Sequence, residues 1–130
     1  MNFEDSNFKE NKWVEMEMKG KMLHFKCKQD IVIDTKAVES ILIDKNLFTN
    51  GLSVPAFVDF RGVKYFTITS MTLVSTQNYI LNFRALAVLL GSFPQITLGN
   101  FFLHIYKQSV PVKMFTDEEK ALKWLDKINA

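Results

Sequence analysis

Three short apolar segments, separated by stretches with helical periodicity, set the strongest limit on how this chain can fold. They are residues 54–60 (VPAFVDF), 84–90 (RALAVLL) and 110–115 (VPVKMF). RALAVLL taken alone is compatible with a helix or a strand. Its neighbours favour a strand that is buried on both faces of a parallel sheet. Strands that alternate with helices predict right-handed crossovers and helices packed against the sheet, which is an α/β fold.

Four helices are expected: one before the first of these strands, one in each of the two intervals between strands, and one after the last. Asp34 can cap a first helix, residues 71–82 form a second, and Pro94 opens a third. Near the C-terminus, Thr116 as N-cap and Glu119 three residues later form a capping box for the fourth.

A β-hairpin is predicted before the first helix. Residues 13–18 and 22–28 each alternate in polarity, and Gly20 lies between them. One face of this hairpin is charged, so we expect it at a sheet edge or facing water. The uncovered edge at residues 13–18 is then the expected surface for a homodimer.

The chain has 130 residues and a mass of 15.1 kDa, which is the size of one domain. Residues 1–11 read as a flexible N-terminal tail, and residues 12–130 as a single α/β domain. Apolar residues make up 48% and charged residues 23%, which excludes a wholly disordered chain. The net charge of +2 gives no indication of a nucleic-acid partner.

The targeting and cysteine signals point to the cytoplasm. Cys27 is the one cysteine, so no intramolecular disulfide forms. The longest apolar run, residues 85–90, is far short of the roughly 20 residues that a membrane-spanning helix needs. The polar N-terminus has no signal-peptide pattern.

Catalytic, metal and cofactor motifs are missing from the sequence. His24 and His104 belong to no HExxH motif or Cys/His cluster, and a satisfied or solvated histidine is the simpler interpretation of each. The glycines are isolated, so no phosphate-binding loop can be built. Cys27 alternates with Phe25 and Leu23 and is expected to face the core. No cofactor or metal is expected.

Asp59 is the most informative polar residue, because it lies near the carboxyl end of an apolar strand, where α/β folds place ligands. With Arg61 and Arg84 it forms a candidate set of ligand or anion contacts. The structural alternative is that Asp59 pairs with one of these arginines or accepts backbone N–H groups. An enzyme that uses Asp59 with an arginine is a further hypothesis.

An aromatic cluster on the expected third helix has two interpretations. Phe101, Phe102 and Tyr106 have helical spacing, which is typical of core residues. They could instead line an apolar pocket between this helix and the sheet. The chain would then be a small apolar-ligand (lipid-like) binding protein.

The order of elements and the segments themselves resemble the STAS domain, the SpoIIAA-like fold of bacterial anti-sigma-factor antagonists. VPAFVDFRGVKYF resembles the family's central strand and the approach to its second helix, and RALAVLLGSFPQITLGNFF resembles the next strand and third helix. PVKMFTDEEKALKWL is similar to the last strand and its capped final helix. The resemblance covers about residues 13–128 and is greatest to short bacterial STAS/SEC14-named proteins. It implies a mixed β-sheet with an N-terminal hairpin and four helices packed on it.

The resemblance also implies a function. STAS antagonists that act as phosphoswitches carry Asp-Ser at the start of the second helix. Here those positions fall on Thr67 and on Ile68, which has no hydroxyl group. Thr69 and Ser70 could substitute as phospho-acceptors, or they could simply cap the helix. The family suggests a non-enzymatic regulatory module in a bacterial cytoplasm. It would dock a protein partner through the loop after Phe66, without the usual phosphoserine switch.

Overall fold

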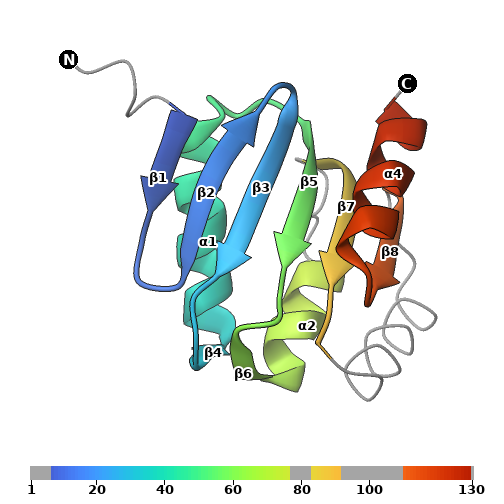
Figure 1. Ribbon diagram of the computed structural model, residues 1–130. Coiled ribbons are helices and arrows are strands. Elements are labelled where there is room, and N and C mark those ends of the chain that lie inside the picture. The colour runs from blue at the N-terminus through green and yellow to red at the C-terminus, as the bar shows by residue number, and fades with distance from the viewer. Residues whose placement is uncertain (1–6, 77–82, 92–109, 130) are drawn as a thin grey trace.

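The computed structural model describes residues 7–76, 83–91 and 110–129 (Figure 1). The strands are β1 (Phe8–Glu10), β2 (Val14–Lys19), β3 (Met22–Cys27), β4 (Ile31–Ile33), β5 (Val54–Asp59), β6 (Val63–Phe66), β7 (Phe83–Leu89) and β8 (Val112–Phe115). The helices are α1 (Thr35–Phe48), α2 (Ile68–Thr76) and α4 (Glu118–Asn129).

The main sheet is mixed and has six strands in the order β1-β2-β3-β5-β7-β8. The first three strands pair antiparallel, and β3, β5, β7 and β8 pair parallel. The parallel strands are joined by crossovers, as the alternation of strands and helices predicts. A second, two-stranded parallel sheet joins β4 to β6.

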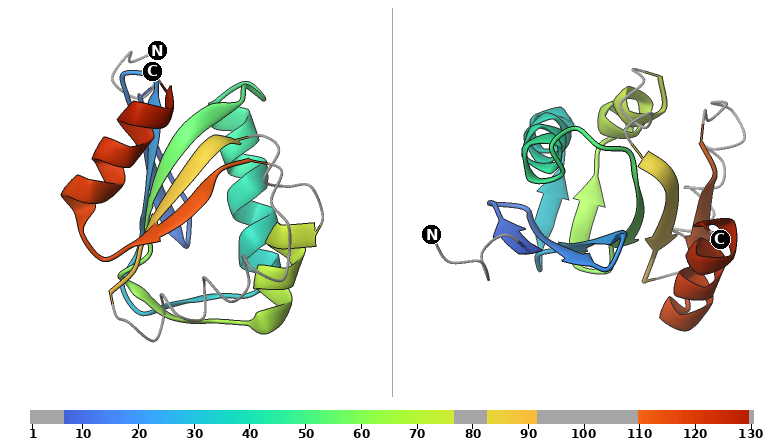
Figure 2. Two further views of the ribbon diagram at one scale, coloured as in Figure 1. Left: turned by 90° about the vertical axis from the view of Figure 1, so that its right-hand side faces the viewer. Right: turned by 90° about the horizontal axis from the view of Figure 1, so that it is seen from above.

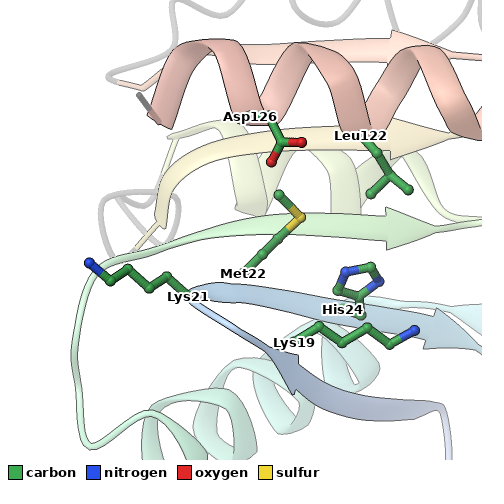
Figure 3. A pocket seen from close by; sticks show the side chains of 6 residues that line it. All are labelled: Lys19, Lys21, Met22, His24, Leu122 and Asp126. Atoms are coloured by element: carbon green, nitrogen blue, oxygen red, sulfur yellow. The ribbon is translucent and has the colours of Figure 1, made fainter.

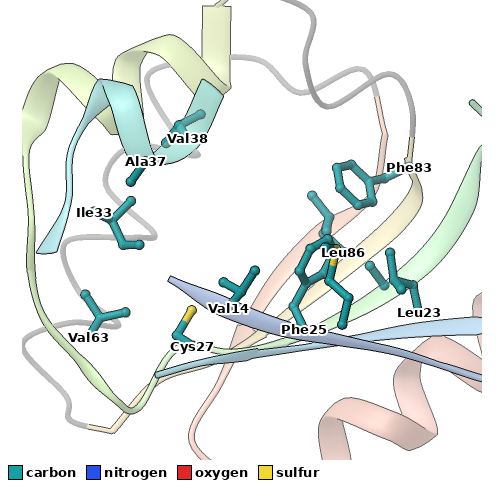
Figure 4. Close-up of a cluster of buried hydrophobic side chains, with 12 residues drawn as sticks. Val14, Leu23, Phe25, Cys27, Ile33, Ala37, Val38, Val63, Phe83 and Leu86 are labelled. Atoms are coloured by element: carbon teal, nitrogen blue, oxygen red, sulfur yellow. The ribbon is translucent and has the colours of Figure 1, made fainter. Parts of the chain in front are cut away.

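Helices lie on both faces of the main sheet, with α1 and α2 on one side and α4 on the other (Figure 2). The larger core lies between the sheet and α1, and Figure 4 shows side chains from the strands meeting those of the helix there. The smaller core lies under α4, where Phe57 and Leu89 pack against Ala121 and Leu125. The three-layer arrangement explains why β5 and β7 are apolar on both faces.

Alternation along β3 assigns its side chains to the two faces. Leu23, Phe25 and Cys27 are buried toward α1, whereas His24 is half-buried on the opposite face. The predicted core position of Cys27 is therefore confirmed. Burial, followed by the nearby charge of Asp59, raises the pKa of this thiol to about 12.

The N-terminal edge of the sheet differs from the expectation. β1 pairs with β2 from Phe8 opposite Glu17 to Glu10 opposite Glu15. The predicted uncovered edge at residues 13–18 is therefore wrong, because β1 already occupies it. The predicted tail at residues 1–11 is wrong for 8–10, which are too short a strand to give an alternating pattern.

The side chains of Asp34 and Asp117 cap the N-termini of α1 and α4. The Asp34 cap is confirmed, since its Oδ1 accepts from the backbone N–H of Ala37 at 2.8 Å. The last helix is capped by Asp117 rather than by Thr116, because Asp117 Oδ1 accepts from the N–H of Lys120 at 3.1 Å. The carboxylate is one residue closer to the open N–H groups than the threonine.

The predicted second helix begins three residues early, at Ile68 rather than at Met71. Three helices are present within the described residues, not the four that were expected. The helix predicted to open at Pro94 falls in residues 92–109, which lie outside the described part of the chain.

Candidate functional site

The junction between β6 and α2 holds the three predicted phospho-acceptor or docking residues. Thr67 caps the helix, because its Oγ1 accepts from the backbone N–H of Ser70 at 3.1 Å. The Ser70 hydroxyl donates back to the carbonyl of Thr67 at 2.7 Å, and Ser70 is fully buried. The Thr67 N–H donates to the carbonyl of Ile33 at 2.9 Å, which ties the junction to the small sheet.

Two large side chains with apolar surface are exposed at this junction. Tyr65 is 54% exposed and Ile68 is 68% exposed, on either side of the Thr67 cap. Thr69 is exposed as well, whereas Ser70 points inward. Of the three predicted hydroxyl residues, Thr69 is therefore the most accessible, and an apolar pair surrounds the cap.

Asp59 and Arg61 form a two-pronged ion pair at the carboxyl end of β5. Arg61 Nε donates to Asp59 Oδ1 at 3.0 Å, Arg61 Nη2 donates to Oδ2 at 2.8 Å, and the Arg61 backbone N–H donates to Oδ1 at 3.1 Å. Burial by itself raises the pKa of Asp59, but the bonds and charge of Arg61 outweigh it and hold that pKa below its usual value. Arg61 Nη2 also lies 3.6 Å from Glu118.

Arg84 does not join this pair. Leu89 is the residue of β7 opposite Asp59, so Arg84 lies roughly 16 Å away along the strand. The three residues predicted as one set of anion contacts are thus divided between two ends of the sheet, and two carboxylates already hold the guanidinium of Arg61.

The candidate apolar pocket cannot be placed in the same way. Phe101, Phe102 and Tyr106 lie outside the described residues, as does His104.

A buried lysine, Lys45 of α1, was not identified from the sequence. Its Nζ lies 3.3 Å from the carbonyl oxygen of Leu52, 3.4 Å from Asn46 Oδ1 and 4.5 Å from the centroid of the Phe83 ring. Burial lowers the pKa of Lys45 to about 8. Helical spacing from the core residue Val38 to position 45 was the signal that could have found it.

A groove between the hairpin and α4 was also missed. It has a volume of about 280 Å³ and is lined by Lys19, Lys21, Met22, His24, Leu122 and Asp126 (Figure 3). Its two walls come from opposite ends of the chain, so no local sequence pattern indicates it.

The charge on His24 depends on both walls of this groove. Burial and the charge of Lys19 lower the pKa of His24, and Glu17 and Glu118 oppose that shift. The balance favours a neutral imidazole near pH 7.

Two further features were sought in the described ranges 7–76, 83–91 and 110–129. No group of three histidine, cysteine or acidic side chains there could hold a metal ion. Nor is any helix of these ranges long and apolar enough to cross a membrane.

Comparison with known proteins defines the class of the fold. The structure is similar to the crystal structure of an uncharacterised DUF3478-family protein with a SpoIIAA-like fold from Shewanella loihica PV-4, at a TM-score of 0.60 and 16% identity. The match covers 90% of this chain and 98% of that one, so the predicted SpoIIAA-like fold is confirmed.

The chain belongs to the family described as Domain of unknown function (DUF7793), whose model matches residues 16–129. No curated protein matches the sequence.

Proposed function

We propose that this protein is a non-enzymatic, STAS-type regulatory module of a bacterial cytoplasm that docks a protein partner through the β6–α2 junction. The observation that carries the proposal is the exposure of Tyr65 and Ile68 beside the Thr67 cap. Contiguous exposed apolar patches often mark contact surfaces between proteins, and tyrosine is enriched among the residues that contribute most to binding there.

The chemistry of the junction supports docking without a phosphoserine switch. The position where a phosphoswitch would carry its acceptor holds Ile68, and the nearby Ser70 hydroxyl is buried and bonded to Thr67. Apolar contact by Ile68 therefore replaces the charge-dependent recognition that a phosphate would supply.

The polar residues elsewhere favour a binding role over catalysis. Asp59 is the carboxylate best placed for chemistry at the carboxyl edge of the sheet, yet Arg61 holds it in its ionised form. A general base is most effective when its pKa lies near the working pH, and the shift of Asp59 is in the opposite direction.

Site-specific photo-crosslinking in the source cells tests the docking surface. A photoreactive phenylalanine analogue at Tyr65 should give one major crosslinked protein, identified by mass spectrometry. Ile68→Asp should remove that crosslink, because a charge at the centre of an apolar contact opposes desolvation.

The matched control is Ile43→Asp on α1, where the isoleucine is 61% exposed. This variant should keep the crosslink. If both substitutions remove it equally, or if Tyr65 captures no protein, the β6–α2 junction is not the docking surface.

A further inference from the structure

The groove between the hairpin and α4 is a concave surface separate from the proposed docking junction. α4 packs mainly against β5, β7 and β8, on the far half of the sheet. The edge of α4 therefore forms one wall, and the turn between β2 and β3 forms the other (Figures 1 and 3).

The floor of the groove is apolar. Met22 from the start of β3 lies between the two walls, and Leu122 from α4 faces it near the His24 ring (Figure 3). Both side chains are half-buried, and the His24 ring rests on the buried Phe57 at a centroid distance of 5.4 Å. An apolar group of a few carbons placed there would cover Met22 and Leu122.

The walls carry opposite charges. Lys19 and Lys21 lie on the hairpin side, and Lys19 is directly across from Met22 in the β2–β3 register. Asp126 lies on the α4 side, above Met22 (Figure 3). Within the described part of the chain, no salt bridge or side-chain hydrogen bond joins either lysine to Asp126, so the charges of the two walls are not paired with each other.

We propose that this groove binds a small zwitterion with an apolar side chain, such as a free aliphatic amino acid. Its carboxylate would face Lys19, its ammonium group would face Asp126, and its side chain would lie on Met22 and Leu122. A volume of about 280 Å³ lies just below the range of roughly 300–1,000 Å³ for ligand pockets, which suits a small occupant such as an amino acid. The inference goes beyond the proposed docking function and uses a different surface.

Four small molecules separate the contributions of each charge and of the side chain. L-leucine carries all three groups, 4-methylpentanoate lacks the amine, 3-methylbutylamine lacks the carboxylate, and glycine lacks the side chain. Binding is followed by NMR through the His24 imidazole and the Met22 methyl group, with signals assigned from His24→Gln and Met22→Leu. Leucine should shift both signals saturably and bind up to about fivefold more tightly than each of the two probes that lack one charge, the upper end for an exposed charge pair. Glycine should also bind more weakly than leucine, because it has no side chain to cover Met22 and Leu122.

Two substitutions test the orientation of the ligand. Asp126→Asn should remove the advantage of leucine over 4-methylpentanoate, and Lys19→Gln should remove its advantage over 3-methylbutylamine. Lys26→Gln, on the same face of β3 but outside the groove lining, should change neither.

The proposal is overturned if leucine shifts neither signal up to its solubility limit. It is also overturned if the four probes bind alike, or if Asp126→Asn weakens all of them equally.

Discussion

The ammonium nitrogen of Lys45 lies 4.5 Å from the centroid of the Phe83 ring, so a cation faces an aromatic ring inside the core beneath α1. The ring and nearby oxygens stabilise the cation, but burial outweighs them and lowers the pKa of Lys45 from 10.5 to about 8.

Lys45 should make stability depend on alkaline pH. Between about pH 8 and 10.5 the unfolded chain binds a proton at Lys45 that the folded chain has released. The free energy of unfolding therefore gains a contribution that rises with pH across this window, and below pH 8 that contribution is lost. In urea denaturation, the free energy of unfolding of the wild type should rise relative to that of Lys45→Met across this window. The comparison removes the opposing effect of Cys27, whose raised pKa lowers the stability of both proteins equally above pH 9. Equal pH slopes for the two proteins would contradict it.

Cys27 should be unreactive in the folded protein. Its pKa is about 12 rather than 9.0, so the thiolate is roughly a thousandfold less populated near neutral pH, and the side chain is buried. Labelling with a thiol-specific disulfide reagent should be slow in buffer and rapid above the urea midpoint. Rapid labelling without urea would mean that β3 opens locally.

Arg61→Gln should lower the free energy of unfolding by about 1 kcal/mol, because Asp59 loses two charge-assisted hydrogen bonds. The pKa of Asp59 should rise at the same time. The stability that the lowered pKa of Asp59 contributes above about pH 3.8 in the wild type should therefore decrease in the variant. Arg84→Gln is the matched control: this arginine is exposed, and its substitution should change stability by less than about 0.5 kcal/mol. If the two substitutions lower the free energy of unfolding equally, the Asp59–Arg61 ion pair does not contribute the stability expected here.

Gly62→Ala should be strongly destabilising, by more than about 2 kcal/mol. A Cβ at position 62 would lie 2.6 Å from the carbonyl oxygen of Lys28 and 2.8 Å from that of Cys27, and backbone atoms cannot move aside easily. Gly91→Ala serves as the comparison, since its Cβ would be 3.7 Å from a flexible part of Arg61. Thermal melting of both variants decides this, and a Gly62→Ala protein that melts with the wild type would contradict the prediction.

The elements that were predictable from the sequence are those with a strong local signal. β5 and β7 are continuous apolar runs, and Asp34 precedes a helical pattern. β4 and β6 have three and four residues, too few for a period to be recognised, and their pairing depends on the tertiary fold. The start of α2 was predicted three residues too late, because Thr67, Thr69 and Ser70 can each act as an N-cap, and the structure uses Thr67.

The candidate sites also differ in whether their contacts are local in the sequence or depend on the tertiary fold. The Asp59–Arg61 pair is local, two residues apart, and was among the alternatives weighed from the sequence. The separation of Arg84 from Asp59 follows from the strand register, which the sequence did not specify. The groove forms only when α4, which carries Asp126, packs beside the hairpin that carries Lys19, so only a three-dimensional structure reveals it.

The division of the main sheet into an antiparallel half and a parallel half has a consequence for the order of folding. β1, β2 and β3 are joined by short connections, so their pairing closes small loops at low entropic cost. The pairing of β3 with β5 closes a much longer loop, which contains β4 and α1. The pairing of β7 with β8 closes another long loop, residues 90–111. We therefore expect the folding nucleus to lie in the hairpin half. Core substitutions in it should slow folding, whereas substitutions in β8 should mainly speed unfolding.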